Sequence, residues 1–327
     1  MACYGSVLGF RIGRAGLGVH LMDAGDRPGI TGGEEAQDSA HYWEGLAGMN
    51  NITDHTEMML PEPAYALGDL LGVPVPNLAH GEGLPLLWHW VYLLDRPAQA
   101  DLGADGHPLL GTIAASPRPG QRRMWAGGRV RTTAPLRCGE PATKRSRVLS
   151  IQEKQGRSGP LTFIVVGRQI LQHERVVIDE QQDIVYRDGV SPTGQPPAPE
   201  EEGSTVPPAN GEWAIEVSPI LLFRFSALTY NAHRIHYDRD YARRVEGYAG
   251  LVVHGPLQAL AMTEAARAAR YRAGQHDVSL YFEYRLTSPL FDHQGMVVGA
   301  TRKQDALVTA VRDHQGRRTA TGTLRNA

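Results

Sequence analysis

The chain of 327 residues is about twice the length of a common domain, which favours two domains or one large one. Its 42% of hydrophobic and 21% of charged residues are typical of a globular protein with a real core, and they exclude a wholly disordered or collagen-like chain. The formal net charge of −2 gives no general attraction to nucleic acid or to an anionic membrane, so we expect neither as a partner.

The cysteine content and the apolar runs indicate the compartment. Cys3 and Cys138 are too few for a disulfide framework or a cysteine zinc site, which fits a reducing compartment, and we expect a cytoplasmic protein. The longest strongly apolar run, residues 84–94, is too short to span a bilayer. Arg11 and Arg14 interrupt the apolar run near the start of the chain, which argues against a secretory signal.

Two segments lack the periodicity of helices or strands. Residues 1–40 are rich in glycine and end in an acidic stretch, so we interpret them as a loose N-terminal extension. Residues 189–212 concentrate Pro, Gly and Glu, which is typical of a solvated linker. The sequence therefore predicts one domain over residues 41–188 and a second over residues 213–327.

The same order of elements is expected in both domains. In the first, a helix begins at Pro85 and runs through LPLLWHWVYLL, because proline is well tolerated at the first helical position. In the second, a helix begins at Pro256 and ends near Gly274. Runs rich in β-branched residues follow each helix and predict strands over residues 128–138, 142–154, 160–172 and 176–187, and over 278–291, 296–304, 306–313 and 319–326.

One short match supports an internal repeat. RTTAPL at residues 131–136 matches RLTSPL at residues 285–290, with a constant offset of 154 residues. A long helix followed by antiparallel strands buries its apolar stripe only if the sheet curls round it. We therefore expect a tandem α+β fold with two such units side by side, and not an alternating βαβ arrangement.

The densest group of polar side chains lies in residues 223–256, FRFSALTYNAHRIHYDRDYARRVEGYAGLVVHGP. This segment resembles the MaoC-like, R-specific enoyl-CoA hydratase 2 family, whose signature places a His five positions after an Asp and a His-Gly at the start of a central helix. It is most similar to the branch of mesaconyl-CoA and itaconyl-CoA hydratases and of 3-hydroxyacyl-thioester dehydratases. LPLLWHWVYLL, RRMWAGGRVR and SGPLTFIVVGRQI resemble the degenerate first domain of that branch, so the similarity covers about residues 42–327.

The resemblance implies a double hot-dog fold, with antiparallel sheets each wrapped round a central helix, and a hydro-lyase that adds water to an enoyl thioester or removes it from a 3-hydroxyacyl thioester. Carried over by position, His236 matches the catalytic His, Asn231 matches the catalytic Asp, and Gly255 matches the glycine whose N–H faces the thioester oxygen. Asn cannot ionise, so proton removal must rest on His236, while Asn231 can still orient a water.

The chemistry of the proposed reaction fits these residue types. Water attacks the β carbon of an α,β-unsaturated thioester, and negative charge builds on the thioester oxygen. Pro256 has no N–H, so the Gly255 amide and the positive end of the helix dipole are expected to face that oxygen. An imidazole, with an ordinary pKa near ~6.5, suits the uptake and return of a proton.

Two explanations of Asn231 stay open. In the first, the substrate brings its own carboxylate, as a mesaconyl-type C4 acyl group does, and a second anion would repel it by about 4 kcal/mol at ~4 Å and an effective dielectric of ~20. In the second, the branch has drifted and an amide still holds the water. Kinetics of Asn231→Asp distinguish the two.

Other residues are candidates for binding the substrate, although packing or solvation explains each of them equally well. A metal site of His233 and His254 with Asp238 or Asp240 is considered and not expected. The candidates are Arg234, Tyr237 and His254 in the second domain, and Arg123 and Trp125 in the first.

No cofactor is expected except coenzyme A as part of the substrate. An acyl carrier protein as the carrier remains an alternative, because a local arginine cluster would not show in the overall charge. A non-catalytic thioester-binding partner and a thioesterase on the same fold are further alternatives. A homodimer of double hot dogs is a compatible assembly.

Overall fold

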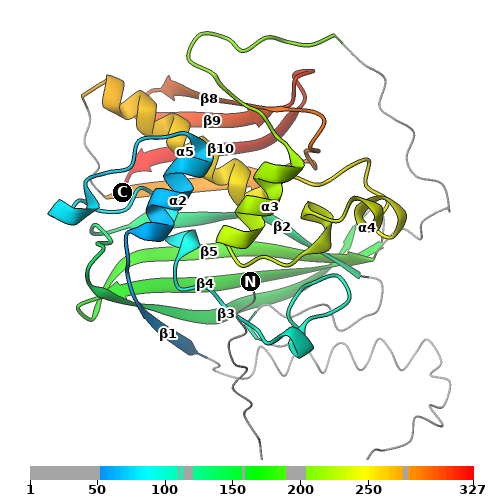
Figure 1. Cartoon of the computed structure of the whole chain (residues 1–327), viewed down its shortest axis with the longest axis horizontal. Coiled ribbons are helices and arrows are strands. Elements are labelled where there is room, and N and C mark those ends of the chain that lie inside the picture. Colours follow the sequence, from blue (N-terminus) through cyan, green and yellow to red (C-terminus); the bar gives the residue numbers. More distant parts are fainter. Residues whose placement is uncertain (1–51, 110, 113–120, 157–158, 189–203, 275–278) are drawn as a thin grey trace, which may run out of the picture.

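The computed structural model describes residues 52–109, 111–112, 121–156, 159–188, 204–274 and 279–327 (Figure 1). The predicted extension, residues 1–40, and most of the predicted linker lie outside these described residues. Within them, one large antiparallel sheet forms the frame of the molecule, and the helices lie on one side of it (Figure 1). The α+β class predicted from the sequence is confirmed.

The sheet has ten strands in the order β1-β3-β4-β5-β2-β7-β10-β9-β8-β6. The two predicted sheets are thus the two halves of one continuous sheet. The seven strands predicted after residue 138 overlap β3, β4, β5, β7, β8, β9 and β10. The strand predicted over residues 128–138 lies instead over residues 121–132, as β2, and β1 and β6 were not predicted. The strands are β1 (Thr53–Met58), β2 (Gln121–Thr132), β3 (Pro141–Gly156), β4 (Gly159–Gln172), β5 (Arg175–Asp188), β6 (Trp213–Ile215), β7 (Leu280–Leu286), β8 (Met296–Lys303), β9 (Ala306–Arg312) and β10 (Arg318–Asn326).

The two halves of the chain meet where β2 pairs with β7. Arg131 lies opposite Tyr281, and Arg285, its counterpart 154 residues later, lies opposite Gly127. Residues 127 and 131 therefore each pair with the other's counterpart 154 residues later. This is the pattern that an approximate two-fold axis between the halves produces. No side chain fits at Gly127, because a Cβ there would lie 2.4 Å from the carbonyl oxygen of Tyr284.

The predicted helix at Pro256 is confirmed as α5 (Gly255–Arg272), which lies across β8, β9 and β10 (Figure 1). Most of its residues are buried on all sides, from Leu257 to Ala266, so packing rather than one apolar stripe holds it in place. Gly274, at φ 66°, follows its last turn.

The predicted helix at Pro85 is wrong. The segment instead forms a short 3₁₀ helix, η2 (Trp88–Val91), between Leu87 and Leu93, which both have positive φ. Bulky aromatic residues favour a helix weakly. Trp88 donates to Glu264, whereas Trp90 donates to Glu180, so neighbouring side chains reach buried partners on different elements. Among the residues that the structure describes, a long central helix is therefore present in the second half alone.

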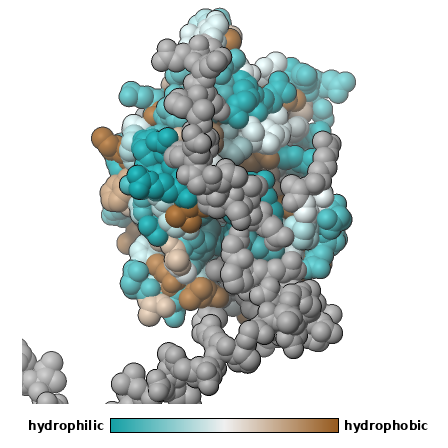
Figure 2. Space-filling view, turned by 90° about the vertical axis from the view of Figure 1, so that its right-hand side faces the viewer, coloured by the Kyte–Doolittle hydropathy of each residue, from teal (hydrophilic) through white to brown (hydrophobic). Residues whose placement is uncertain are grey.

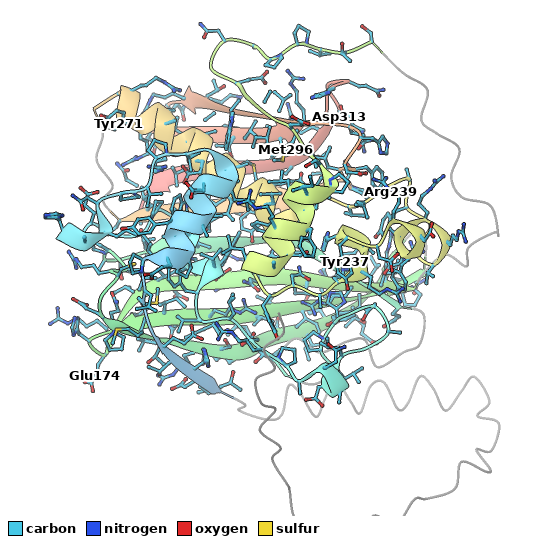
Figure 3. All side chains as sticks on the ribbon, in the orientation of Figure 1. Glu174, Tyr237, Arg239, Tyr271, Met296 and Asp313 are labelled. Carbon is cyan, nitrogen blue, oxygen red and sulfur yellow. The ribbon has the colours of Figure 1, made fainter. Side chains whose placement is uncertain are left out.

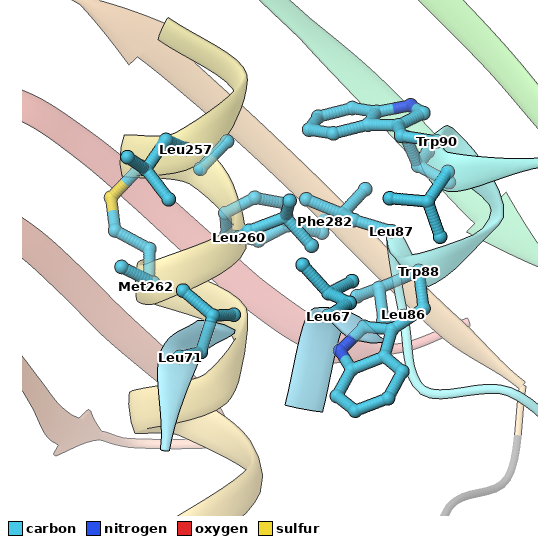
Figure 4. Packing of buried hydrophobic residues seen from close by; sticks show 14 of the residues in the cluster. Leu67, Leu71, Leu86, Leu87, Trp88, Trp90, Leu257, Leu260, Met262 and Phe282 are labelled. Atoms are coloured by element: carbon cyan, nitrogen blue, oxygen red, sulfur yellow. The ribbon is translucent and has the colours of Figure 1, made fainter. Parts of the chain in front are cut away.

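Short helices fill the concave face that a second central helix would have covered. α2 and α3 contact each other in front of the sheet, and Figure 4 shows Leu67 and Leu71 of α2 beside Leu260 of α5 in one core. Within the described residues, no helix has the length and apolarity that crossing a membrane would require. The coloured residues visible in Figure 2 are mostly hydrophilic, with separate hydrophobic ones among them. The remaining helices are α2 (Glu62–Leu71), η1 (Leu78–His80), η3 (Gln99–Asp101), α3 (Pro219–Leu228), η4 (Arg234–His236) and α4 (Arg239–Arg244).

Candidate active site

A cavity of about 780 Å³ lies between the two halves of the chain. Its walls come from β2, β4 and β5 of the first half and from α3, η4 and the start of α5 in the second. The three predicted catalytic residues, His236, Asn231 and Gly255, all line it. The fold thus brings together residues that are up to 24 positions apart in the sequence.

His236 ends η4 and is buried. Its Nδ1 lies 2.7 Å from the carbonyl oxygen of Val252. A carbonyl can only accept, so Nδ1 carries the proton and Nε2 keeps a free lone pair. Burial, together with the neighbouring His233, lowers the pKa of His236 from 6.5 to about 3. At neutral pH the side chain is therefore an uncharged base of fixed tautomer.

His254 lies behind His236 and is not on the cavity wall. The two rings stack, with centroids 3.7 Å apart and an interplanar angle of 19°. His254 is fully buried, and its Nε2 hydrogen-bonds Ser226 Oγ at 2.9 Å. Burial holds its pKa well below the ordinary value. The predicted substrate-binding residue His254 is thus placed as a support for the imidazole of His236.

Asn231 follows α3 in a tight turn, after Tyr230 at φ 51°. Its Oδ1 accepts a hydrogen bond of 3.0 Å from the backbone N–H of His233. This is the local turn that Asn and Asp side chains favour. The amide oxygen is therefore engaged in holding the loop, and the NH₂ group is the part of the side chain that offers a new hydrogen bond.

Gly255 is the first residue of α5 and directly follows His254. Because the His254 ring stacks on His236, the Gly255 backbone lies close to the candidate base. The first N–H groups of a helix have no intrahelical acceptor and lie at the positive end of its dipole. A Cβ at this position would lie 2.3 Å from Leu286 Cδ1, so a glycine fits here without displacing that side chain.

Three of the predicted substrate-binding residues line the cavity, namely Arg123, Trp125 and Tyr237. Trp125 Nε1 donates to the hydroxyl of Tyr284 at 2.9 Å, which fixes the indole on the wall. Tyr237 is 43% exposed, lies beside α4 in Figure 3, and donates its hydroxyl to the carbonyl of Ala232. It therefore stands where the cavity meets solvent.

Arg234, like His254, is not among the residues that line the cavity. Its guanidinium pairs with Asp238 at 2.8 Å and lies 4.1 Å from the centroid of the Tyr241 ring. It also donates to the carbonyl of Ala104. These contacts hold the η4–α4 turn against the first half of the chain.

A second group of polar side chains borders His236. The rings of His107 and His233 are tilted by 38° with their centroids 4.0 Å apart. His107 Nδ1 hydrogen-bonds Asp105 at 2.8 Å, and His233 Nε2 lies 3.3 Å from Glu246 Oε1. The potential ligand atoms of Asp105, His107 and His233 lie within 4.8 Å of one another. They differ from the set considered in the sequence, because His254 bonds Ser226 and is not part of this group.

The first half contributes polar residues that the sequence analysis missed. Glu180 is fully buried in β5 and accepts hydrogen bonds from His89 Nε2 at 3.0 Å and Trp90 Nε1 at 2.9 Å. Burial alone would raise the pKa of Glu180, but the hydrogen bonds from His89 and Gln182 and the charge of Arg168 lower it. The signal was present, since Glu180 shares the inward face of a strand with Ile178 and Gln182, which stand two positions before and after it. A charged residue at such a position needs partners.

Comparison with solved structures identifies the fold as a double hot dog. HtdX from Mycobacterium tuberculosis superposes with a TM-score of 0.58 at 17% identity, covering 84% of this chain and all of that one. A MaoC-like dehydratase from Phytophthora capsici gives a TM-score of 0.54 at 14% identity, covering 84% and 95%. At these identities the likeness concerns the fold alone.

Comparison of sequences identifies the family. The model of hydroxyacyl-thioester dehydratase type 2 matches residues 87–292, and the chain belongs to that family. Mesaconyl-C(4)-CoA hydratase of Chloroflexus aurantiacus is 49% identical over 214 residues, which cover 64% of this chain and 71% of that protein. The mitochondrial hydroxyacyl-thioester dehydratase type 2 of Schizosaccharomyces pombe is 27% identical over 237 residues, covering 63% and 74%. The predicted family and hydro-lyase class are confirmed.

Proposed function

We propose that the protein adds water to the double bond of an α,β-unsaturated acyl-CoA thioester, and catalyses the reverse dehydration, in the cavity beside His236. One observation carries this proposal. An uncharged imidazole, with its tautomer fixed by the Val252 carbonyl, faces the same cavity as the first amide of a helix. A base and an oxyanion donor side by side are the two groups that this reaction needs.

The proposed steps use protein groups and water only. His236 Nε2 takes a proton from water as the hydroxyl oxygen bonds to the β carbon and the electron pair of the double bond moves onto the thioester oxygen. The Gly255 N–H donates to this enolate oxygen, and the helix dipole stabilises its charge. The imidazolium then returns the proton to the α carbon, and the thioester carbonyl reforms. The product is the 3-hydroxyacyl thioester.

The proposed substrate is a short acyl group that carries a free carboxylate. The name of the Chloroflexus relative points to a mesaconyl group, and Asn231 supports the proposal because an Asp at that place would add a second anion. The amide of Asn231 instead offers its NH₂ group as a donor, since its oxygen is bound by the His233 N–H.

Coenzyme A is the proposed carrier, and the cytoplasm is the proposed compartment. The relative of 49% identity is a CoA-thioester hydratase by name, and the net charge of −2 provides no broad basic surface for an acidic carrier protein. The two cysteines of the chain fit a reducing compartment. Coenzyme A enters only as part of the substrate.

Turnover tests the proposal directly. Crotonyl-CoA and mesaconyl-CoA are incubated with the protein, and the loss of enoyl absorbance is followed together with the release of free thiol. We expect hydration by the wild type and a loss of about 100-fold or more in kcat for His236→Ala. His173→Ala is the matched control, because His173 is an exposed histidine on the β4–β5 turn, with 74% of its side chain exposed.

Three results would contradict the proposal. Binding of both thioesters without hydration would indicate a non-catalytic partner. Release of free thiol in place of hydration would indicate a thioesterase. An unchanged rate in His236→Ala would show that another group is the base.

A further inference from the structure

The cavity wall contributed by the first half of the chain carries a surplus of positive charge. The chain as a whole has a formal charge of −2, so this surplus is local. Four lining residues are cations at neutral pH and two are carboxylates, namely Arg123, Lys144, Arg168 and Arg187 against Asp95 and Glu180.

Both carboxylates on this wall already have other donors. Glu180 Oε1 accepts from Trp90 Nε1 at 2.9 Å and from Gln182 Nε2 at 2.6 Å, and its Oε2 accepts from His89 Nε2 at 3.0 Å. Asp95 Oδ1 pairs with Lys144 Nζ at 2.7 Å. The ion pair therefore neutralises Lys144, and Glu180 is held by three donors.

Arg168 is different from these neighbours. It lies on β4 directly opposite Glu180 of β5, and its Nε is buried without a hydrogen-bond partner among the described residues. The charge of Arg168 lowers the pKa of Glu180 and of Asp95, and it adds to the effect of burial in lowering the pKa of Lys144 and of Arg123, which places it amid the charged groups of the wall. Arg168 as a whole is half-buried, and its guanidinium keeps its charge, so a buried Nε–H without an acceptor leaves this group able to meet an anion that enters the cavity.

An aromatic wall joins Arg168 to the candidate catalytic groups. Trp90, which donates to Glu180, packs edge-on against Trp125 with ring centroids 5.6 Å apart. Trp125 Cβ in turn lies 3.7 Å from where a Cβ on Gly255 would stand. The wall from Gly255 through Trp125 and Trp90 to Glu180 is thus continuous, and it ends on the strand pair that carries Arg168.

We propose that Arg168 binds the free carboxylate of a dicarboxylic acyl group that is joined to coenzyme A through its other carboxyl group. The inference rests on the proposed function. It makes Arg168 of β4 the residue that determines whether an acyl group with a free carboxylate is preferred over one without it. A guanidinium matches a carboxylate by two parallel N–H···O bonds, so it selects the charge and the geometry together. The phosphates of coenzyme A offer similar chemistry, and the test separates the two sources.

Fumaryl-CoA and crotonyl-CoA form the matched substrate pair, because a carboxylate in the first replaces the methyl group of the second. We expect Arg168→Met to lower kcat/KM for fumaryl-CoA by about 10- to 100-fold and to change that for crotonyl-CoA by less than about 3-fold. Arg168→Lys should recover part of the loss, because it restores the charge without the fork. Arg147→Met is the control, since Arg147 is exposed on β3 opposite Gly167.

The outcomes separate this inference from the proposed function. An equal loss on both thioesters would assign Arg168 to the phosphates of coenzyme A and overturn the inference. An unchanged kcat/KM for fumaryl-CoA in a folded Arg168→Met, or a wild type that hydrates only crotonyl-CoA, would overturn it as well and leave the proposed function standing. A wild type that hydrates neither thioester would overturn the proposed function and this inference with it.

Discussion

At the scale of single residues, the environment of His236 determines when the candidate base is available. The ring is buried against His254 and its Nδ1 is tied to Val252, so the neutral form with a free Nε2 persists far into the acidic range. An exposed histidine would lose this form near pH ~6.5. The stacked arrangement thus keeps the base unprotonated at the expense of its basicity.

The pH dependence of hydration follows from this. Because the pKa of His236 is lowered to about 3, kcat/KM should stay constant from about pH 8 to about pH 5.5. Initial rates on crotonyl-CoA over this range, taken with protein shown to be folded by circular dichroism, provide the measurement. A decline in kcat/KM centred near pH ~6.5 would show that the free enzyme carries an ordinary histidine as its base.

The identity of residue 231 has a separate consequence. Asn231→Asp keeps the hydrogen bond to the His233 N–H but adds a negative charge at the cavity wall. We expect kcat/KM for mesaconyl-CoA to fall by about 100-fold or more, since two charges ~4 Å apart at an effective dielectric of ~20 repel by about 4 kcal/mol. Crotonyl-CoA, assayed in parallel, should lose far less. A variant that keeps the preference for the carboxylated thioester would favour drift of the branch over repulsion.

The sequence indicates the candidate catalytic residues but not their partners. His236, Asn231 and Gly255 stand in one sequence motif, so the sequence selects them together, and the fold places all three at the cavity. His107 and Arg168 come from distant segments, and no local pattern connects them with that motif. Their positions depend on the packing of the two halves, which a single sequence does not specify.

At the scale of elements, the start of α5 depends on the absence of a side chain at residue 255. A methyl group there would lie 2.3 Å from Leu286 Cδ1, so Gly255→Ala must push that side chain or the helix start aside. We expect kcat to fall by about 10- to 100-fold, because a shift of about 1 Å in a positioning group has this effect. The fold should persist, since the atom that must move is the end of a flexible side chain.

A second substitution provides the control for Gly255→Ala. Leu286→Ala removes the clashing Cδ1, so the double variant should recover part of the lost kcat. Hydration rates and thermal unfolding of the two single variants and the double variant make the measurement. If the double variant is as slow as Gly255→Ala, the contact with Leu286 is not what limits the rate.

Element prediction succeeded where local and tertiary preferences agree. Pro256, the apolar run after it and Gly274 all favour one helix, and α5 forms as expected. The segment after Pro85 carries a similar apolar run, yet it forms η2, because Trp88 and Trp90 donate to buried carboxylates on different elements. Apolar composition identifies a buried segment, and its hydrogen-bond partners decide its backbone.

At the scale of the whole molecule, the two halves share one sheet and one core. β2 pairs with β7 across the junction, and the main hydrophobic cluster includes Leu67 and Trp88 from the first half and Leu260 from the second. The cavity lies between these halves, so neither half contains the candidate site alone. The repeat of 154 residues made the tandem arrangement predictable, whereas the junction itself required the pairing register.

On acidification, the free energy of unfolding should begin to fall at a higher pH than the titration of carboxylates alone would predict. The pKa values of His236 and His254 are lower in the folded state than the ordinary 6.5, so the unfolded chain binds more protons below that pH. The stabilisation is complete above pH ~6.5 and is lost as the pH falls, at up to about 1.4 kcal/mol per pH unit for each histidine. Urea unfolding at a series of pH values between about 7.5 and 5 makes the measurement. A free energy of unfolding that stays constant over this range would show that both histidines titrate normally in the folded protein.

The central claim is that the His236 imidazole and the Gly255 amide act on one substrate from the same wall of the cavity. A crystal structure with a bound 3-hydroxyacyl-CoA product tests it most directly. The account predicts the thioester oxygen about 3 Å from the Gly255 nitrogen and the 3-hydroxyl oxygen about 3 Å from His236 Nε2. A thioester oxygen beyond hydrogen-bond reach of Gly255, or a 3-hydroxyl group held away from His236, would contradict it.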